Sequence, residues 1–211
     1  MGRSTALTYD LRMAASRKHT HRRRTIRLPS YDYASPGAYF ITLCTFRRLS
    51  IFSEVTSGSV RLSKLGEIAR DELLRTESIR DEAEVDAFVI MPNHVHAIVL
   101  LRTTVGATGR SPLPRTADGP PPRSIGALVA GLKSATTTRI NRLRGAPGSP
   151  VWQRNYYERV IRNEVELAYA RQYIVDNPRE WPGDPNNTAR VKRPRSPRTG
   201  RSTLDISTHS G

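Results

Sequence analysis

The sequence predicts an α+β fold: a ferredoxin-like split βαβ sandwich, in which an antiparallel sheet carries helices on one face and a further C-terminal helix is appended. Strand-like and helix-like segments follow one another in the order strand, helix, strand, strand, helix, strand, and a last helix follows them. The chain has 211 residues, of which 37% are apolar, enough for one core but few for two. We therefore expect one folded domain over residues 30–183.

The first two elements follow from local pattern. Residues 38–45 predict a strand, because they are aromatic and β-branched and come after a Ser-Pro-Gly turn signal. Ser63 then precedes apolar residues at helical spacing, which predicts a helix that runs to about residue 80.

The apolar stretch 88–101 contains Pro92, which cannot donate a hydrogen bond to a strand ladder. We therefore expect a tight hairpin, with one strand ending near Met91 and the next beginning at His94. Side chains on a strand alternate between its faces, so His94 and His96 project the same way and can share one cation. A buried imidazole satisfied by a hydrogen bond is the alternative, and the local sequence leaves both open.

The next elements are a loop, a helix and a strand. Residues 103–123 are rich in Gly, Pro, Thr and Arg without periodicity, which predicts a mobile loop whose role the sequence does not give. Ser124 is expected to cap the second helix, which has an apolar stripe and ends at Gly145. Residues 152–161 predict the fourth strand.

The last helix brings further polar groups. It is expected to begin at Asn163, where Glu166 three residues later resembles a capping box, and Pro178 is expected to stop it near Asn177. Tyr173 and Asn177 are one turn apart and are therefore neighbours. The Asn177 amide and the two imidazoles could hold a divalent cation with open positions. The blander alternative is that the tyrosine is a core aromatic and that the asparagine only ends the helix.

Charge and cysteine content restrict the partners. Lys and Arg total 34 against 19 Asp and Glu, which gives a net charge of +15 and makes nucleic acid the expected partner. A membrane is not expected, because no apolar run approaches the ~20 residues that span a bilayer and no secretory signal is present. Cys44 is the only cysteine, so an internal disulfide is excluded and a cytoplasmic, nucleoid-associated location is expected.

Basic residues are candidates for phosphate contact. Residues 1–29 predict a flexible basic arm, and residues 184–211 predict a disordered basic tail. Solvated surface charge is the alternative for each cation. The candidate DNA-binding residues are Arg22, Arg23, Arg24, Lys133, Arg139, Arg142 and Arg154.

Several motifs occur in a fixed order between residues 22 and 182. They are Met91-Pro92-Asn93 before His94-Val95-His96, then Trp152-Gln153-Arg154, Arg162-Asn163-Glu164, Tyr173-Ile174 and Asn177-Pro178. In these motifs the chain resembles the single-tyrosine His-hydrophobic-His (HUH) transposases of insertion-sequence type, and specifically the REP-associated tyrosine transposases.

The resemblance implies an enzyme: a tyrosine transposase with a ferredoxin-like domain. Such an enzyme is a metal-dependent single-stranded DNA endonuclease that nicks and rejoins DNA near repeated palindromic hairpins through a 5′-phosphotyrosine. By that match Tyr173 is the nucleophile, and His94, His96 and Asn177 hold Mg²⁺ or Mn²⁺. Two alternatives stay open: a hairpin-binding protein of the same fold without cleavage activity, and a metal-dependent hydrolase that uses an activated water.

Tyr156 and Tyr157 are rival nucleophiles. They are adjacent in the expected fourth strand and face opposite sides, so at most one could reach the site. The sequence also leaves open whether the protein acts as a monomer or a homodimer.

Overall fold

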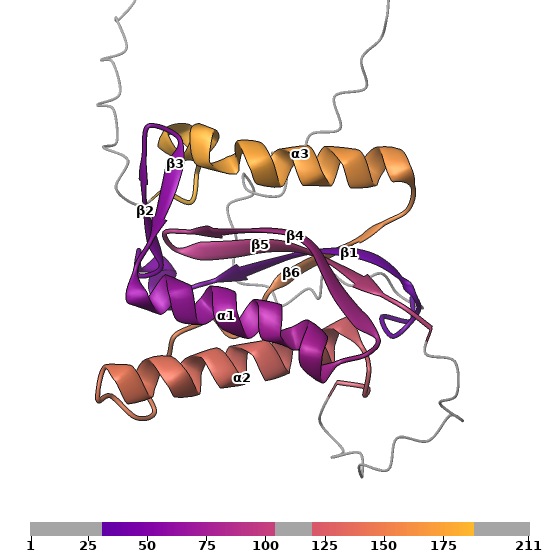
Figure 1. The fold of residues 1–211 in the computed structure, drawn as a ribbon, viewed down its shortest axis with the longest axis horizontal. Helices are drawn as coiled ribbons and strands as arrows, with labels where there is room; N and C mark the ends of the chain where they lie inside the picture. Colours follow the sequence, from indigo (N-terminus) through magenta and orange to yellow (C-terminus); the bar gives the residue numbers. More distant parts are fainter. Residues whose placement is uncertain (1–30, 104–119, 188–211) are drawn as a thin grey trace, which may run out of the picture.

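A four-stranded antiparallel sheet in the order β4-β5-β1-β6 forms the centre of this computed structural model, which describes residues 31–103 and 120–187 (Figure 1). The strands are β1 (Gly37–Cys44), β4 (Ala83–Met91), β5 (His94–Leu101) and β6 (Tyr157–Ile161). β5 is an interior strand between β4 and β1, and Met91 pairs with His94 across the tight turn. The predicted hairpin and the predicted sandwich topology are therefore confirmed.

Two helices cover one face of the sheet and a third covers the other (Figure 1). They are α1 (Lys64–Ile79) and α2 (Ile125–Leu143) on the first face and α3 (Glu164–Glu180) on the second. Alternation along β1 explains both cores. Tyr39, Ile41 and Leu43 lie in the core beneath α1 and α2, whereas Phe40 lies in the smaller core beneath α3.

The predicted helix caps form as expected. The Ser63 and Ser124 hydroxyls accept hydrogen bonds from backbone N–H groups three residues later, and Asn163 Oδ1 accepts from the N–H of Glu166. α2 ends just before Gly145, which has a φ of 61° and so adopts the left-handed conformation that terminates helices.

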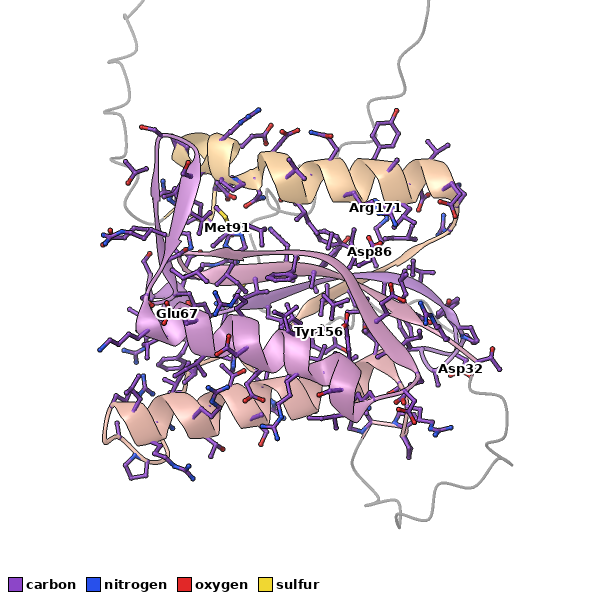
Figure 2. The ribbon with its side chains drawn as sticks, in the orientation of Figure 1. Asp32, Glu67, Asp86, Met91, Tyr156 and Arg171 are labelled. Carbon is purple, nitrogen blue, oxygen red and sulfur yellow. The ribbon has the colours of Figure 1, made fainter. Side chains whose placement is uncertain are left out.

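A bulge in β4 helps to hold α3 on the sheet. The register between β4 and β5 shifts between Val85 and Ala87, so Val85 packs with the α1 and α2 core while Ala87 packs with the α3 core. Asp86, at the bulge, accepts a hydrogen bond from Arg171 Nε on α3 at 2.8 Å (Figure 2).

The structure differs from the sequence predictions in three places. A short hairpin of β2 (Ser53–Thr56) and β3 (Ser59–Leu62) precedes α1 and was not predicted. β6 begins at Tyr157 and not at residue 152: Trp152 makes an isolated bridge with Thr45, and the carbonyls of residues 153–155 then accept hydrogen bonds from Lys133 Nζ. α3 continues through Pro178 to Glu180, since a proline in the last turn removes only one backbone hydrogen bond.

The predicted arm, with Arg22, Arg23 and Arg24, lies outside the described residues, as do most of the predicted loop and tail. The structure does describe residues 184–187, the first four of the predicted tail. No helix in the described part has the length and apolarity that crossing a bilayer requires.

Candidate active site

β5 places two imidazoles side by side on the sheet face that α3 covers. The ring centroids of His94 and His96 are 4.5 Å apart, and the two residues are 0% and 4% exposed. The intervening Val95 belongs to the core on the opposite face. The alternation predicted from the sequence is therefore confirmed, and it buries both rings in the fold.

Each imidazole is held through Nδ1. Asn93 donates its Nδ2 to the backbone carbonyls of Arg48 and Asn186, so its Oδ1 is the atom that accepts from His94 Nδ1, at 2.9 Å. His96 Nδ1 lies 2.8 Å from the hydroxyl oxygen of Thr42 on the neighbouring strand. In contrast, neither Nε2 atom has a hydrogen-bond partner among residues 31–103 and 120–187.

Burial keeps both imidazoles neutral. It lowers the pKa of His94 to about 3, an effect that Arg48 reinforces and Asn177 partly offsets. It also lowers the pKa of His96 well below the ordinary value, and the neighbouring His94 adds to this. His94, whose Nδ1 donates to Asn93, has a lone pair on Nε2 that can bind a metal ion. His96 offers the same nitrogen when its Nδ1 donates to the Thr42 hydroxyl oxygen.

α3 brings a phenol and an amide to the imidazoles. The ring centroid of Tyr173 is 5.3 Å from that of His96 and 5.8 Å from that of Phe40. Asn177, one helical turn later, is 3% exposed, and its Oδ1 has no partner in the described part of the chain. Ile174, between them, packs in the α3 core and fixes the orientation of the helix.

The segment that follows α3 closes this end of the site. The ring of Trp181 lies 5.9 Å from that of His94, and Asn186 Oδ1 accepts a hydrogen bond from Arg48.

Burial, then the charge of Asp184, raises the pKa of Tyr173 to about 12, and the interaction with Asn177 works against this rise. The phenol is therefore fully protonated near neutral pH unless a positive charge stabilises the phenolate.

The three unpartnered buried atoms fit a divalent cation. Two imidazole nitrogens and an amide oxygen are ordinary ligands for such ions, and hydrogen bonds to the other ring nitrogens are typical of metal-binding histidines. Among the described residues no three His, Cys, Asp or Glu side chains are placed to hold a metal ion together, so a cation here would depend on the Asn177 oxygen. The residues present therefore suit the metal that the sequence motifs implied.

No family model matches the chain. An uncharacterized protein of Haemophilus influenzae is 33% identical over 168 residues, which cover 78% of this chain and 92% of that protein. The two proteins belong to one family.

Two solved structures are also similar to this member of the family. A REP-associated tyrosine transposase bound to a REP hairpin has 20% identity and a TM-score of 0.48, over 74% of each chain. A protein of Deinococcus radiodurans, named as a candidate transposase, has 19% identity and a TM-score of 0.38, over 71% of this chain and 95% of that one.

The rival tyrosines lie on opposite faces, as predicted. The Tyr156 hydroxyl donates to Glu158 at 2.7 Å, and its ring packs with the α1 and α2 core. Tyr157 packs with the α3 core and pairs with Thr42, so it lies two strands from His96. The structure thus leaves Tyr157 as the residue to compare with Tyr173.

The four candidate DNA-binding residues that the structure describes separate into two groups. Arg139 Nη1 donates to the buried Glu72 at 2.8 Å, so this cation is held between α2 and α1. Lys133, Arg142 and Arg154 instead line one pocket on the α2 side of the sheet.

Sequence reasoning missed the residues that orient the imidazoles. Thr42 becomes a candidate only when β1 is paired with β5 in the observed register, which places it opposite His96. Asn93 was visible in the motif, and its position directly before His94 was the available signal. Nothing in the sequence indicated a role for Trp181 or Asp184, because only the folded chain brings the end of α3 close to the start of β5.

Proposed function

We propose that the protein is a metal-dependent tyrosine transposase that nicks and rejoins single-stranded DNA beside palindromic hairpins. The observation that carries the proposal is the Tyr173 ring 5.3 Å from that of His96, beside three buried ligand atoms that have no hydrogen-bond partner within residues 31–103 and 120–187. The order of the sequence motifs and the net charge of +15 support DNA as the substrate. The hairpin preference rests on the family resemblance of the motifs.

Tyr173 supplies the nucleophile. Its Oη attacks the phosphorus of a phosphodiester, and an Oη–P bond forms while the bond from phosphorus to the 3′-oxygen breaks. The phenol loses its proton to solvent and the leaving oxygen takes one up, so the products are a 5′-phosphotyrosyl strand and a free 3′-hydroxyl. Because the ester is exchanged and not hydrolysed, a second 3′-hydroxyl can reverse the step and join strands without ATP.

The surrounding residues support that step. Held by His94, His96 and Asn177, Mg²⁺ or Mn²⁺ would neutralise charge on the phosphate as a Lewis acid. Thr42 and Asn93 hold the imidazoles through Nδ1 and so leave both Nε2 atoms free to bind. Ring contacts with Phe40 and His96 fix the phenol in one orientation, which lowers the entropic cost of attack.

The test is covalent capture of DNA. Labelled hairpin oligonucleotides with single-stranded flanks are incubated with protein and Mn²⁺, and the products are separated on denaturing gels. We expect a protein–DNA adduct that Tyr173→Phe abolishes, that the matched Tyr157→Phe variant retains, and that EDTA prevents. Cleavage retained in Tyr173→Phe would refute the proposed nucleophile.

The alternatives give different products in the same experiment. A binding protein without cleavage activity would shift the hairpin on native gels, with or without metal, and yield no nick. A hydrolase would release a free 5′-phosphate without any adduct. Either result would replace the transposase proposal.

A further inference from the structure

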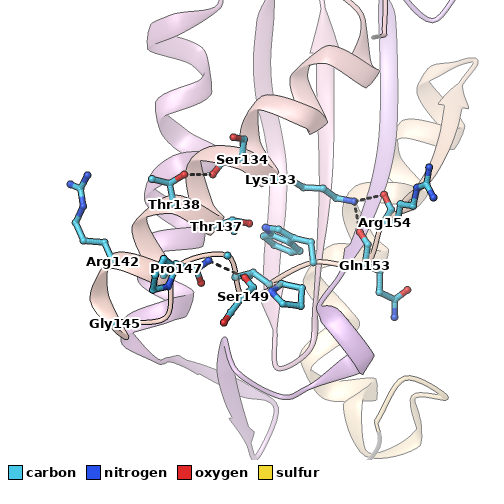
Figure 3. Close-up of a pocket in the computed structure, with 15 residues that line it drawn as sticks. Lys133, Ser134, Thr137, Thr138, Arg142, Gly145, Pro147, Ser149, Gln153 and Arg154 are labelled. Carbon is cyan, nitrogen blue, oxygen red and sulfur yellow. Dashed lines mark hydrogen bonds between the residues drawn. The ribbon is translucent and has the colours of Figure 1, made fainter. Parts of the chain in front are cut away.

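A cavity of about 840 Å³ lies between the C-terminal half of α2 and the segment 145–154 that leads toward β6 (Figure 3). It is on the α2 side of the sheet, whereas the candidate active site is on the α3 side. Its volume falls within the ~300–1,000 Å³ typical of small-molecule and cofactor sites.

The lining of this cavity is cationic and contains no carboxylate. Of the 15 residues that line it, three carry positive charge (Lys133, Arg142 and Arg154) and none is Asp or Glu. Arg142 and Arg154 make no ion pair within the described part of the chain. Unpaired guanidinium groups bind phosphate through paired charge-assisted hydrogen bonds, so the lining favours a phosphate-bearing ligand.

The cavity also has an apolar aromatic wall with a buried donor. Trp152 lines it together with Val151 and two prolines, and Trp152 is only 8% exposed. Its indole Nε1 has no hydrogen-bond partner among the described residues. Burying an N–H without an acceptor is unfavourable, so a ligand that offers an acceptor at this point would gain by binding.

We propose that this cavity binds one unpaired nucleotide of the DNA. Its base would lie edge-on to Trp152, where it would accept an in-plane hydrogen bond from the indole N–H and contact Val151 and the two prolines, while its phosphate pairs with Arg142 or Arg154. Nucleobases combine a flat apolar face with ring acceptors, which matches the wall and the donor. The inference rests on the proposed function only in taking DNA as the ligand.

The cavity is connected to the candidate active site through β1. Cys44 pairs with His94 on one side, and its carbonyl accepts a hydrogen bond from the N–H of Gln153, a lining residue, on the other. Adjacent strands are about 4.8 Å apart, so Gln153 and His94 are separated by about 10 Å of sheet. A single strand that leaves Tyr173 around the β6 edge therefore reaches the cavity within a few nucleotides.

Trp152 provides a direct readout. The chain has two tryptophans, so Trp181→Phe leaves Trp152 as the only indole. Titration of this variant with single-stranded tetranucleotides, at fixed low salt, should quench its fluorescence saturably and shift its indole N–H resonance. A second substitution, Arg142→Gln or Arg154→Gln, should weaken the quenching at least tenfold. Arg75→Gln on α1 changes the net charge equally, lies outside the lining and should leave the quenching unchanged.

The outcomes separate this inference from the proposed function. Adduct formation at Tyr173 with no response of Trp152 would overturn the inference alone. Conversely, a Trp152 response together with no adduct from the natural sequence, which keeps Trp181, would support the cavity and refute the transposase. Equal sensitivity of Arg75→Gln, or complete competition by inorganic phosphate at matched concentration, would also overturn the inference. Trp152→Phe, checked for folding by circular dichroism, should lower the tetranucleotide affinity measured by anisotropy.

Discussion

The Thr42→Val substitution isolates the hydrogen bond that orients His96. It removes the 2.8 Å contact between Oγ1 and His96 Nδ1 but keeps a β-branched side chain of nearly the same shape in β1. Loss of such an outer hydrogen bond typically weakens metal binding about 10–100-fold, which corresponds to about 1.4–2.7 kcal/mol. Because His96 is 4% exposed, its Nδ1 would also lose its hydrogen-bond partner at a buried position. We therefore expect folding stability to fall by a further ~1–3 kcal/mol.

Isothermal titration with Mn²⁺ measures the first quantity, and urea unfolding without metal measures the second. The matched control is Thr56→Val, which makes the same change at an exposed position of the β2–β3 hairpin. Both measurements should be unchanged in this control. If Thr42→Val is folded and binds Mn²⁺ as tightly as the natural protein, then Thr42 does not orient a metal ligand. Absence of Mn²⁺ binding by the natural protein would refute the metal site itself.

Four further substitutions test stability. In Gly66→Ala the added Cβ would lie 2.0 Å from the Phe52 carbonyl oxygen, so urea unfolding should show a loss of more than about 2 kcal/mol. Gly131→Ala meets no atom closer than 3.6 Å and should stabilise α2 by up to ~1 kcal/mol; equal effects of the two changes would contradict this reasoning. Ile174 is 4% exposed and packs beneath α3, so Ile174→Ala should lower the free energy of unfolding by about 2–5 kcal/mol. It should also slow adduct formation. An unchanged free energy of unfolding would refute the packing role of Ile174. Burial lowers the pKa of Lys133 from 10.5 to about 8, so between pH 8 and 10.5 the unfolded chain binds more protons than the folded chain. The free energy of unfolding, measured relative to Lys133→Met, should therefore rise with pH over this range. A difference between the two proteins that does not change with pH would contradict the shift.

The sequence was sufficient for features that depend on local periodicity. Alternation along 88–101 predicted that His94 and His96 share a face, and helical spacing predicted that Tyr173 and Asn177 are neighbours. The strand and helix order then left few topologies, since split βαβ units satisfy it with short connections. The interior position of β5 follows from that topology.

Features that depend on pairing across the chain were not accessible. β2 and β3 have four residues each, carry charged side chains and show little alternation of apolar and polar residues. Neither segment is therefore recognisable as a strand until it is paired with the other. The start of β6 depends on Lys133, which is distant in sequence and takes the carbonyls of residues 153–155 as hydrogen-bond acceptors. The ring nitrogen that each imidazole can offer to a metal ion likewise depends on distant pairing. Asn93 engages Nδ1 of His94, and the register of β1 against β5 brings Thr42 to Nδ1 of His96.

The position of α3 determines whether one chain suffices for the proposed chemistry. The helix is attached to its own sheet by Leu167 and Ile174 in the core and by the ion pair of Arg171 with Asp86, and the tip of the β2–β3 hairpin at Gly58 lies against it. These contacts all come from the chain that contributes the imidazoles. The candidate site therefore has its phenol, two imidazoles and amide within a single chain, and exchange of α3 with a second copy would require each of these contacts to break and form again between chains.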